Sequence, residues 1–368
     1  MTSLRTLARL LVFLSLAAVI TSFSKEGSIN TISYNRISMN GEVGMDFSKL
    51  FEVIGGIQIE ESDESVFSYI SVEGLVGDDI VLHDLMPSKR ICVIDNRGKV
   101  VSVVSRQGRG PQEYLEIGNL AVDESRRMLY VQDVASKKEI YRYSFDGTFC
   151  GAVPLKYLPS GILINDGYLY VTNLPGATSS YSVYSLDDME LKYESSILKE
   201  TRKTAMAYYD KIFELDGSVF YQQALTNTVY KINQDRMTPF LCIDHGKYTM
   251  PLKYLSSIDL IDRHERSYIN GYSYDMSTDY LFAEYYYGNK RYYDIWKYKE
   301  GKLIYHHKAD IFNNRPGFPI TVNGQTVRAW PIYIHSDTVI CEVYTMNKKG
   351  PFWTTENNNP VLLKLKIK

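Results

Sequence analysis

Short apolar runs and polar turns alternate along the chain after residue 50, and this pattern predicts strands rather than helices. In each unit a first apolar run is joined to a second by a turn such as Asp166-Gly167 or Asp216-Gly217. A third run follows a further loop, and a turn such as Asp146-Gly147 leads to a fourth. These residue types favour the positive φ angles and Asx geometry of β-hairpins. The pattern therefore predicts a repeated four-stranded unit.

The unit occurs six times. The first strands are expected at 69–76, 119–123, 161–165, 211–215, 268–274 and 329–334. The second strands are expected at 80–84, 129–133, 169–173, 219–223, 281–285 and 339–343, and the third at 90–95, 139–144, 181–186, 228–233, 293–298 and 360–368. Six similar four-stranded units are typical of an all-β, six-bladed β-propeller. Two β-sandwich domains are the alternative, but they do not explain six similar units. Helical periodicity is weak outside the N-terminal segment and residues 196–209.

The two ends of the chain predict how the ring closes. The sixth unit has three strands and then ends at Lys368, whereas a spare strand pattern, EVIGGIQIEE (52–61), precedes the first unit. An incomplete blade would leave an unpaired edge, so this N-terminal segment is expected to supply the outer strand of the last blade. The expected organisation is a signal peptide at 1–24, an N-terminal extension at 25–50 and the propeller at 51–368.

The first 24 residues have the pattern of an export signal. Arg5 and Arg9 precede an apolar run at 10–20, and Ser22-Phe23-Ser24 supplies small residues before a cut at Lys25. The run is short for a membrane span, and a buried helix or an uncleaved anchor is the alternative. No cysteine lies near the cut, so a lipoprotein anchor is not expected. The protein is expected in the periplasm or outside the cell, without stable membrane insertion after cleavage.

Composition narrows the possible partners. The formal net charge is −2 and charged residues make up 23% of the chain, so no basic footprint indicates nucleic acid. Tyrosine occurs 31 times against 14 phenylalanines, which suits half-buried β-surfaces. The four cysteines, which lie far apart in apolar runs, are expected to be buried free thiols, although export permits disulfides; they are Cys92, Cys150, Cys242 and Cys341.

One stretch carries a family resemblance. The run DDIVLHD…RICVIDNRGKVVSVVSRQGRGPQEY (78–114), followed by LYVQD and EIYRYSFDGTF, resembles the exported six-bladed β-propeller family common in Bacteroidetes, a relative of the NHL and TolB-like propellers. The resemblance covers most of the chain after residue 40. It implies the fold and an exported location rather than a defined reaction. Many members look like lipoproteins, and this sequence departs from them by lacking the anchoring cysteine.

The stretch SRQGRGPQEY (105–114) is expected to connect the fourth strand of one blade to the first strand of the next. Its two glycines and Pro111 suit a tight crossing. A phosphate-binding loop would need a helix directly behind it, and a P-loop would also need a lysine-serine pair. Neither is visible in the sequence. Ligand contacts by Arg106, Arg109 and Glu113 remain an open alternative, since crossings lie on one face of the ring.

Loops between second and third strands share that face, and two long ones carry aromatic residues. They are YYYGNKRYY (285–293) and the loop at 345–359. Exposed aromatics beside amides and cations can stack on a sugar or grip a peptide, whereas alternate tyrosines can instead pack between blades. The candidate ligand-binding residues are Arg106, Arg109, Glu113, Tyr286, Tyr287, Tyr292, Phe352 and Trp353.

The sequence therefore predicts an exported, non-catalytic propeller that binds a protein, peptide or glycan on this face. No nucleophile elbow, H-E-x-x-H or dinucleotide fingerprint occurs, and no cofactor is predicted. His306 and His307 are neighbours in a strand, so they point to opposite sides. The alternative is a hydrolase or lyase with a divalent metal at the channel mouth, for which the candidate ligands are Asn119, Asp210, Asn270 and Glu284.

Overall fold

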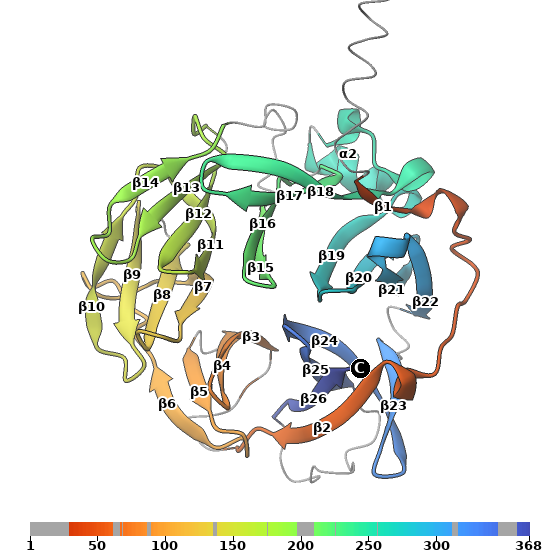
Figure 1. The fold of residues 1–368 in the computed structure, drawn as a ribbon, viewed down its shortest axis with the longest axis horizontal. Helices are drawn as coiled ribbons and strands as arrows, with labels where there is room; N and C mark the ends of the chain where they lie inside the picture. The colour runs from red at the N-terminus through yellow and green to blue at the C-terminus, as the bar shows by residue number, and fades with distance from the viewer. Residues whose placement is uncertain are drawn as a thin grey trace, which may run out of the picture.

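The strands of the protein stand as six blades around a central axis (Figure 1). The computed structural model describes residues 29–61, 67, 69–86, 90–134, 138–174, 176–196, 210–224, 226–255, 257–310, 316–344 and 359–368. Within these ranges each blade contains four antiparallel strands, which confirms the predicted six-bladed β-propeller. The expected signal peptide at 1–24 and the helical pattern at 197–209 lie outside the described residues.

In blades 1 to 3 the strands follow one another from the hub to the rim. Blade 1 contains β3 (Tyr69–Val76), β4 (Asp79–Met86), β5 (Ile91–Ile94) and β6 (Val100–Val104). Blade 2 contains β7 (Ile117–Asp123), β8 (Met128–Asp133), β9 (Glu139–Ser144) and β10 (Phe149–Pro154). Blade 3 contains β11 (Pro159–Asn165), β12 (Tyr168–Asn173), β13 (Tyr181–Ser185) and β14 (Leu191–Glu194).

Blades 4 to 6 repeat this order, with one antiparallel addition in blade 6 and the parallel strand β1 (Asn30–Ser33) beside blade 4. Blade 4 contains β15 (Lys211–Leu215), β16 (Ser218–Gln222), β17 (Thr228–Asn233) and β18 (Arg236–Asp244). Blade 5 contains β19 (Asn270–Met276), β20 (Tyr280–Tyr287), β21 (Lys290–Lys297) and β22 (Lys302–Asp310). Blade 6 contains β24 (Gln325–His335), β25 (Thr338–Tyr344), β26 (Val361–Ile367) and β2 (Phe51–Gln58). The addition is β23 (Phe318–Val322), which forms an unpredicted hairpin with β24.

Within the described ranges the helices are short and lie between strands. Six are 3-10 turns: η2 (Tyr34–Arg36), η3 (Phe47–Lys49), η4 (Gly246–Tyr248), η5 (Leu252–Tyr254), η6 (Glu265–Ser267) and η7 (Tyr298–Glu300). The α-helix α2 (Ile258–His264) lies between blades 4 and 5, and its N-cap Ser257 accepts a hydrogen bond from the Leu260 amide. The sequence pattern did not predict α2, because a helix of 7 residues leaves little periodicity to detect.

Each blade buries both of its faces, which explains the apolar runs. All four residues of β5 and all five of β13 are buried, whereas the rim strand β6 has a single buried residue, Val104. The buried side chains form six clusters, and each cluster combines residues of two neighbouring blades. No blade has a core of its own. Its stability therefore depends on a neighbour on each side.

The ring closes as the sequence predicts. The rim strand of blade 6 is β2, which pairs antiparallel with β26 from Phe51↔Ile367 to Gln58↔Val361. Within this ladder Ile57 is opposite Leu362, and both side chains are buried in the cluster shared by blades 6 and 1. The first and last strands of the propeller are thus joined by backbone hydrogen bonds, so blade 6 has no missing strand.

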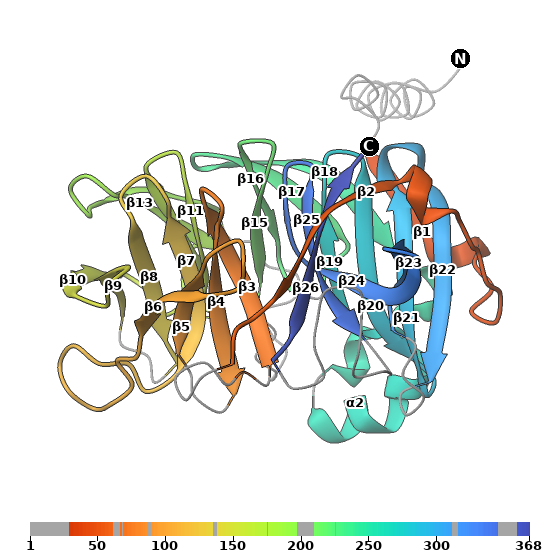
Figure 2. The same ribbon diagram turned by 90° about the horizontal axis from the view of Figure 1, so that it is seen from below.

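The two faces of the ring differ in the connections that they carry. We define the crossing face as the side where the inner strand of each blade begins; the connection with α2 lies there (Figure 2). The loops from second to third strands share this face. The opposite side, the turn face, carries the hairpins from first to second strands, and the C-terminus lies on it (Figure 2). The chain crosses from β6 to β7 through residues 105–116, as predicted for SRQGRGPQEY.

Residues 29–50, here called the strap, run along the outer wall of blades 4 to 6 (Figure 1). The strap begins with β1 (Asn30–Ser33), which pairs in parallel with β18. Farther along, Val43 exchanges two backbone hydrogen bonds with His306 of β22, at 3.0 and 2.9 Å. Phe47 then stacks on Phe318, with ring centroids 4.6 Å apart. The N-terminal extension is therefore an integral part of the wall.

A buried polar network anchors the strap to blade 5. The Tyr34 hydroxyl accepts a hydrogen bond from Trp296 Nε1 at 3.3 Å and lies 3.2 Å from the Tyr272 hydroxyl. Behind it, His306 Nδ1 lies 2.6 Å from Asp294 Oδ1, and both side chains are buried. Burial raises the pKa of the Asp294 carboxyl, while its contacts with His306 oppose the shift. A polar cluster this well buried favours a single position of the strap.

His245 makes this anchor sensitive to acid. Its ring packs edge-on against Tyr34 and Tyr272, with centroids 5.3 and 4.5 Å apart. Burial lowers the pKa of His245 from 6.5 to about 4, and the charge of Asp244 opposes the shift. Below pH 6.5 the unfolded chain binds this proton more readily than the folded protein does. The contribution of His245 is therefore fully present above pH 6.5 and decreases as the pH falls towards 4.

The His245→Phe variant tests this linkage because it keeps an aromatic ring and removes the titration. Between pH 7 and pH 4.5, the wild-type protein should lose about 2 kcal/mol more of its free energy of unfolding than the variant. Urea unfolding at both pH values measures the two losses. Equal losses would contradict the assignment of a buried neutral His245.

Candidate functional site

Exposed apolar side chains concentrate on the crossing face. Four of them lie at the crossing-face ends of strands in blades 1 to 3, and we call this group the apolar rim: Tyr69, Leu115, Val134 and Leu158. Tyr69 is 68% exposed, the highest value among the large hydrophobic residues of the described chain. Leu252, in the connection from blade 4 to blade 5, is also exposed. The other exposed large hydrophobics of the described residues lie on the strap and on the rim strands β2 and β6.

The turn face has the opposite character. Every hairpin from a first to a second strand carries an exposed acidic residue: Asp78, Glu124, Asp166, Asp216, Asp279 and Asp337. Asp166 and Asp216 have φ angles of 47 and 50°, a conformation that aspartate tolerates in tight hairpins. The requirements of the turns thus account for at least these two. The apolar rim distinguishes the crossing face as the better candidate for a contact surface.

The contacts beneath the apolar rim hold its central pair in place. Asp133 Oδ1 accepts hydrogen bonds from the amides of Leu115 and Glu116, both at 3.2 Å. The Val134 amide in turn donates to the Glu116 carbonyl at 2.8 Å. Asp133 is only 8% exposed, so these buried hydrogen bonds hold the backbone of Leu115 beside that of Val134. The sequence analysis missed this pair, although both residues are apolar positions at the ends of connections.

The crossing loop 105–116 is fixed largely by its own contacts. Glu113 accepts a hydrogen bond from the Gly110 amide at 2.8 Å, and a Cβ at Gly108 would collide with the same carboxylate. Arg106 Nε donates to the Gly147 carbonyl of blade 2 at 3.0 Å. Tyr114 is fully buried and donates to the Val104 carbonyl. Arg106 and Glu113 therefore have structural partners, whereas the side chain of Arg109 is exposed.

The predicted aromatic residues of blade 5 divide between interior and surface. Tyr292 is 3% exposed and donates to the Met39 carbonyl of the strap at 3.1 Å. The expectation that Tyr292 contacts an external ligand therefore does not fit its buried position. Burial raises its pKa to about 12. Tyr287 is partly exposed and packs edge-on against Tyr248 at 5.2 Å. Tyr286 is also partly exposed. The alternative that tyrosines pack inside the fold thus holds for Tyr292.

The ring does not gather all of the predicted residues in one place. The crossing loop into blade 2 contains Arg106, Arg109 and Glu113. Blade 2 lies opposite blade 5, whose strand β20 carries Tyr286 and Tyr287 (Figure 1). The remaining two candidates, Phe352 and Trp353, lie outside the described residues. The crossing face therefore carries two separate groups rather than one continuous candidate site.

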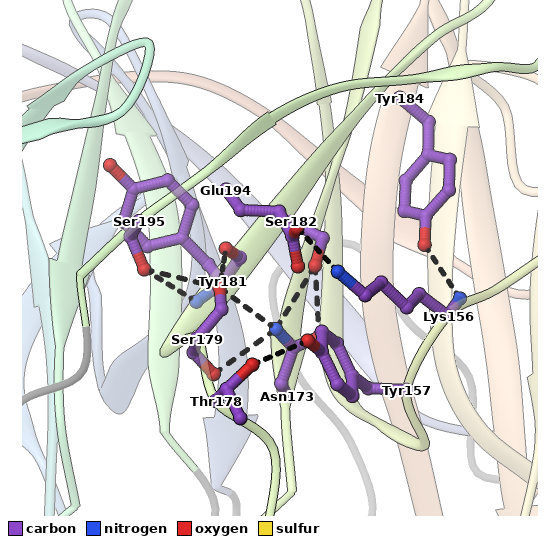
Figure 3. A network of polar contacts seen from close by, with 10 residues as sticks. All are labelled: Lys156, Tyr157, Asn173, Thr178, Ser179, Tyr181, Ser182, Tyr184, Glu194 and Ser195. Carbon is purple, nitrogen blue, oxygen red and sulfur yellow. Dashed lines mark hydrogen bonds and ion pairs between the residues drawn. The ribbon is translucent and has the colours of Figure 1, made fainter.

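A buried serine and asparagine network stabilises the crossing end of blade 3 (Figure 3). It lies beside Leu158, whose carbonyl accepts a hydrogen bond from the Leu174 amide at 2.9 Å. Asn173 Nδ2 donates to the Ser179 carbonyl at 3.2 Å and to Ser182 Oγ at 3.0 Å. Ser195 Oγ accepts hydrogen bonds from the amides of Ser180 and Tyr181, both at 3.0 Å. All of these side chains except the Tyr181 ring are small and polar, and they satisfy the backbone of a connection that has few apolar anchors.

The same network extends to the surface beside the apolar rim. The Tyr157 hydroxyl lies 2.7 Å from Thr178 Oγ1, and Lys156 Nζ pairs with Glu194 at 2.6 Å (Figure 3). The Lys156 amide also donates to the Tyr184 hydroxyl at 2.9 Å. The chain that carries Leu158 is therefore tied to β13, to β14 and to the loop between β12 and β13, which limits its movement.

The Asn173→Ala variant tests how far this network holds the surface. It removes a buried donor from Ser179 and Ser182, which should lower the free energy of unfolding by about 1–3 kcal/mol. Amide hydrogen exchange at 176–180 should accelerate. Thr178→Ala removes only an exposed contact and should change the free energy by less than about 0.5 kcal/mol. Comparable losses in the two variants would contradict the role given to Asn173.

The candidate metal ligands are engaged in hydrogen bonds within the fold. Asn119 donates to Gln132 at 2.6 Å, Asp210 accepts from Tyr221 at 2.7 Å, and Asn270 donates to the Glu265 carbonyl at 2.8 Å. Glu284 pairs with Arg291. Among the described residues, no three His, Cys, Asp or Glu side chains are arranged to hold a metal ion.

The four cysteines are all free, but they differ in exposure. Cys92 and Cys341 are buried, Cys242 is intermediate and Cys150 is exposed on β10. The expectation of buried free thiols is therefore wrong for Cys150. It failed because β10 is a rim strand, whose outer side has no neighbouring blade to cover it.

Comparisons with known proteins place the chain by its fold. A family model described as "Domain of unknown function (DUF4934)" matches residues 30–366. A protein from Bacteroides fragilis described as exported is similar over 93% of this chain and 100% of its own, with 15% identity and a TM-score of 0.64. A protein of unknown function from Bacteroides thetaiotaomicron is similar over 93% of this chain and 75% of its own, with 12% identity and a TM-score of 0.47.

BamB from Moraxella catarrhalis is similar over 86% of this chain and 100% of its own, with 8% identity and a TM-score of 0.46. At these identities the likeness concerns the fold alone. The search of curated proteins found no match. Within the described residues, no helix has the length and apolar character needed to cross a membrane.

Proposed function

The chain belongs to the DUF4934 family, whose description assigns no function. We therefore propose a function from the geometry of the propeller itself. The protein is an exported, non-catalytic scaffold that binds a polypeptide partner on the crossing face. Export is supported by the pattern of Arg5, Arg9 and the apolar run at 10–20. The single observation that carries the binding role is the apolar rim.

The chemistry of the apolar rim favours a polypeptide over the other partners that the sequence left open. Leu115, Val134 and Leu158 are aliphatic, and covering a large apolar side chain completely contributes about 1.5–3 kcal/mol. Aliphatic residues offer little to the hydroxyl groups of a glycan. Tyr69 adds an aromatic ring with a polar end, a combination that is common at protein interfaces. Contacts at blades 1 to 3 are therefore suited to the apolar side chains of a peptide or protein.

The rigidity of the surface supports the same role. Asp133 holds the backbone of Leu115, the Glu116 carbonyl holds the amide of Val134, and the Leu158 carbonyl accepts a hydrogen bond from the Leu174 amide. A contact surface that is already ordered loses little conformational entropy on binding. The enzyme alternative has less support, because each of its candidate metal ligands already has a hydrogen-bond partner in the fold.

Charge substitutions on the apolar rim test the proposal. The double variant Leu115→Asp, Val134→Asp should weaken binding of peptides selected from a displayed random library at least about 100-fold, since about 1.4 kcal/mol corresponds to a factor of ten. Val101→Asp is the matched control, because Val101 is 53% exposed on the rim strand β6. It should bind the same peptides as the wild-type protein does.

Fluorescence polarisation with the selected peptides measures these affinities. Failure to select any peptide, or equal affinity of the double variant and the wild-type protein, would contradict a polypeptide site at the apolar rim.

A further inference from the structure

A second group of polar side chains lies between blades 5 and 6, on the other side of the ring from the apolar rim. Glu284 and Tyr286 belong to β20, and Arg291 and Tyr293 belong to β21. Arg328 joins them from β24 of blade 6. Glu284 and Arg291 retain 20% and 32% of their side-chain exposure. The group is therefore accessible to solvent at one end and buried at the other.

Only one of the two carboxylate oxygens of Glu284 accepts hydrogen bonds from Arg291. Arg291 donates to it from Nε at 2.8 Å and from Nη2 at 2.6 Å, and both bonds go to Oε1. The second oxygen, Oε2, remains an acceptor for a further donor, and Arg291 retains donors on Nη1. The pair therefore presents a charged acceptor and a charged donor side by side. Because the two charges offset each other, the pair does not favour an anion.

Tyr286 adds a partly exposed aromatic ring to this pair. It is the cross-strand partner of Arg291, so the two side chains lie on the same face of the sheet. A Cβ at Gly271 would lie only 2.9 Å from Tyr286 Cδ2. One edge of the ring thus packs against the backbone of Gly271, which has no side chain to displace it. Gly271 has a φ of 55°. This packing restricts the orientation of the ring.

Tyr293 shows that the group is incomplete as it stands. Its side chain is fully buried, and its hydroxyl has no hydrogen-bond partner among the residues that the structure describes. The Arg291 guanidinium lies over the Tyr293 ring, 5.3 Å from the centroid. Burial raises the pKa of Tyr293, and the charges of Arg291, Glu284 and Arg328 also act on its hydroxyl. A buried hydroxyl without a partner is destabilising, so the polar groups here are not fully satisfied by the protein.

Arg328 closes the inner side of the group. Its Nε donates to the Pro316 carbonyl at 2.8 Å, and Nη2 donates to the Tyr305 hydroxyl at 3.3 Å and to the Gly317 carbonyl. These contacts to Tyr305 of blade 5 and to the connection that precedes β23 fix its guanidinium. The guanidinium of Arg328 is therefore already hydrogen-bonded within the protein. This again argues against a site for a strongly acidic ligand.

We propose that Glu284, Arg291 and Tyr286 form a binding site for a neutral pyranose carbohydrate. One sugar hydroxyl donates to Glu284 Oε2, and a neighbouring hydroxyl accepts from Arg291. The apolar C–H face of the sugar lies against the Tyr286 ring. A charged donor and acceptor held side by side match two adjacent hydroxyls of a sugar, and hydrogen bonds to charged groups are the stronger kind. This site goes beyond the polypeptide partner proposed for blades 1 to 3 and does not depend on it.

Binding of defined oligosaccharides to the exported protein tests this site. The probes are cellohexaose, maltohexaose and xylohexaose as neutral ligands and oligogalacturonate as the acidic one, each followed by saturation-transfer NMR and calorimetry. At least one neutral probe should bind in a saturable manner, and oligogalacturonate should bind more weakly. The variant E284Q keeps the shape of the side chain and should lower the affinity about tenfold or more, because it removes a charge-assisted hydrogen bond.

Two further variants separate binding from folding. Tyr286→Ala should abolish sugar binding, whereas Tyr69→Ala, which removes an exposed tyrosine of the apolar rim, should leave it unchanged. Glu52→Gln on the exposed wall of blade 6 is the matched control for E284Q. Arg291→Lys keeps the charge but loses the planar donor, and should weaken binding without unfolding the protein.

The proposal is overturned if no neutral probe binds, if oligogalacturonate is preferred, or if E284Q and Tyr286→Ala bind as the wild-type protein does. Peptide binding at the apolar rim is unaffected by these outcomes, since the two groups lie in opposite blades.

Discussion

The pairing of β2 with β26 is the interaction on which the rest of the structure depends. Every hydrophobic cluster of the protein combines two neighbouring blades, so the stability of each blade rests on the closure of the ring. The ladder from Phe51↔Ile367 to Gln58↔Val361 joins the two ends of the propeller by backbone hydrogen bonds. It also removes the edges that an open six-bladed array would expose. The strap extends this closure by covering the wall of blades 4 to 6.

Closure also determines where ligands can bind. A closed ring leaves two faces, and the direction of the strands assigns to each its own connections. The turn face carries tight hairpins, whose positive φ angles at Asp166 and Asp216 suit short acidic residues. The crossing face carries the longer connections, which are free to present apolar or aromatic side chains. The apolar rim lies on the crossing face, and the Glu284–Arg291 pair lies near the ends of β20 and β21 that point to the same face.

The fold could be predicted from the sequence because alternating strands and turns repeat in a regular order. Even the closure by residues 52–61 followed from counting strands. The missed hairpin of β23 had a readable signal, since Asn323-Gly324 is a strong hairpin pair. The placement of Tyr292 could not be predicted, because the strap that buries it is distant in sequence. The apolar rim was missed for a similar reason: the backbones of Leu115 and Val134 are joined by hydrogen bonds between segments that are separate in the sequence. Local patterns thus predict strands well, whereas contacts between segments decide which side chains reach the surface.

Native-state hydrogen exchange of β2 tests the central claim most directly. If the pairing of β2 with β26 holds the ring together, the amides of β2 that bond to β26 should exchange only with global unfolding. Their opening free energy should then equal that of the buried strands β5 and β13. Exchange of the β2 amides at a much lower free energy, while β5 and β13 stay protected, would show that the ring remains intact without this pairing and would contradict the account.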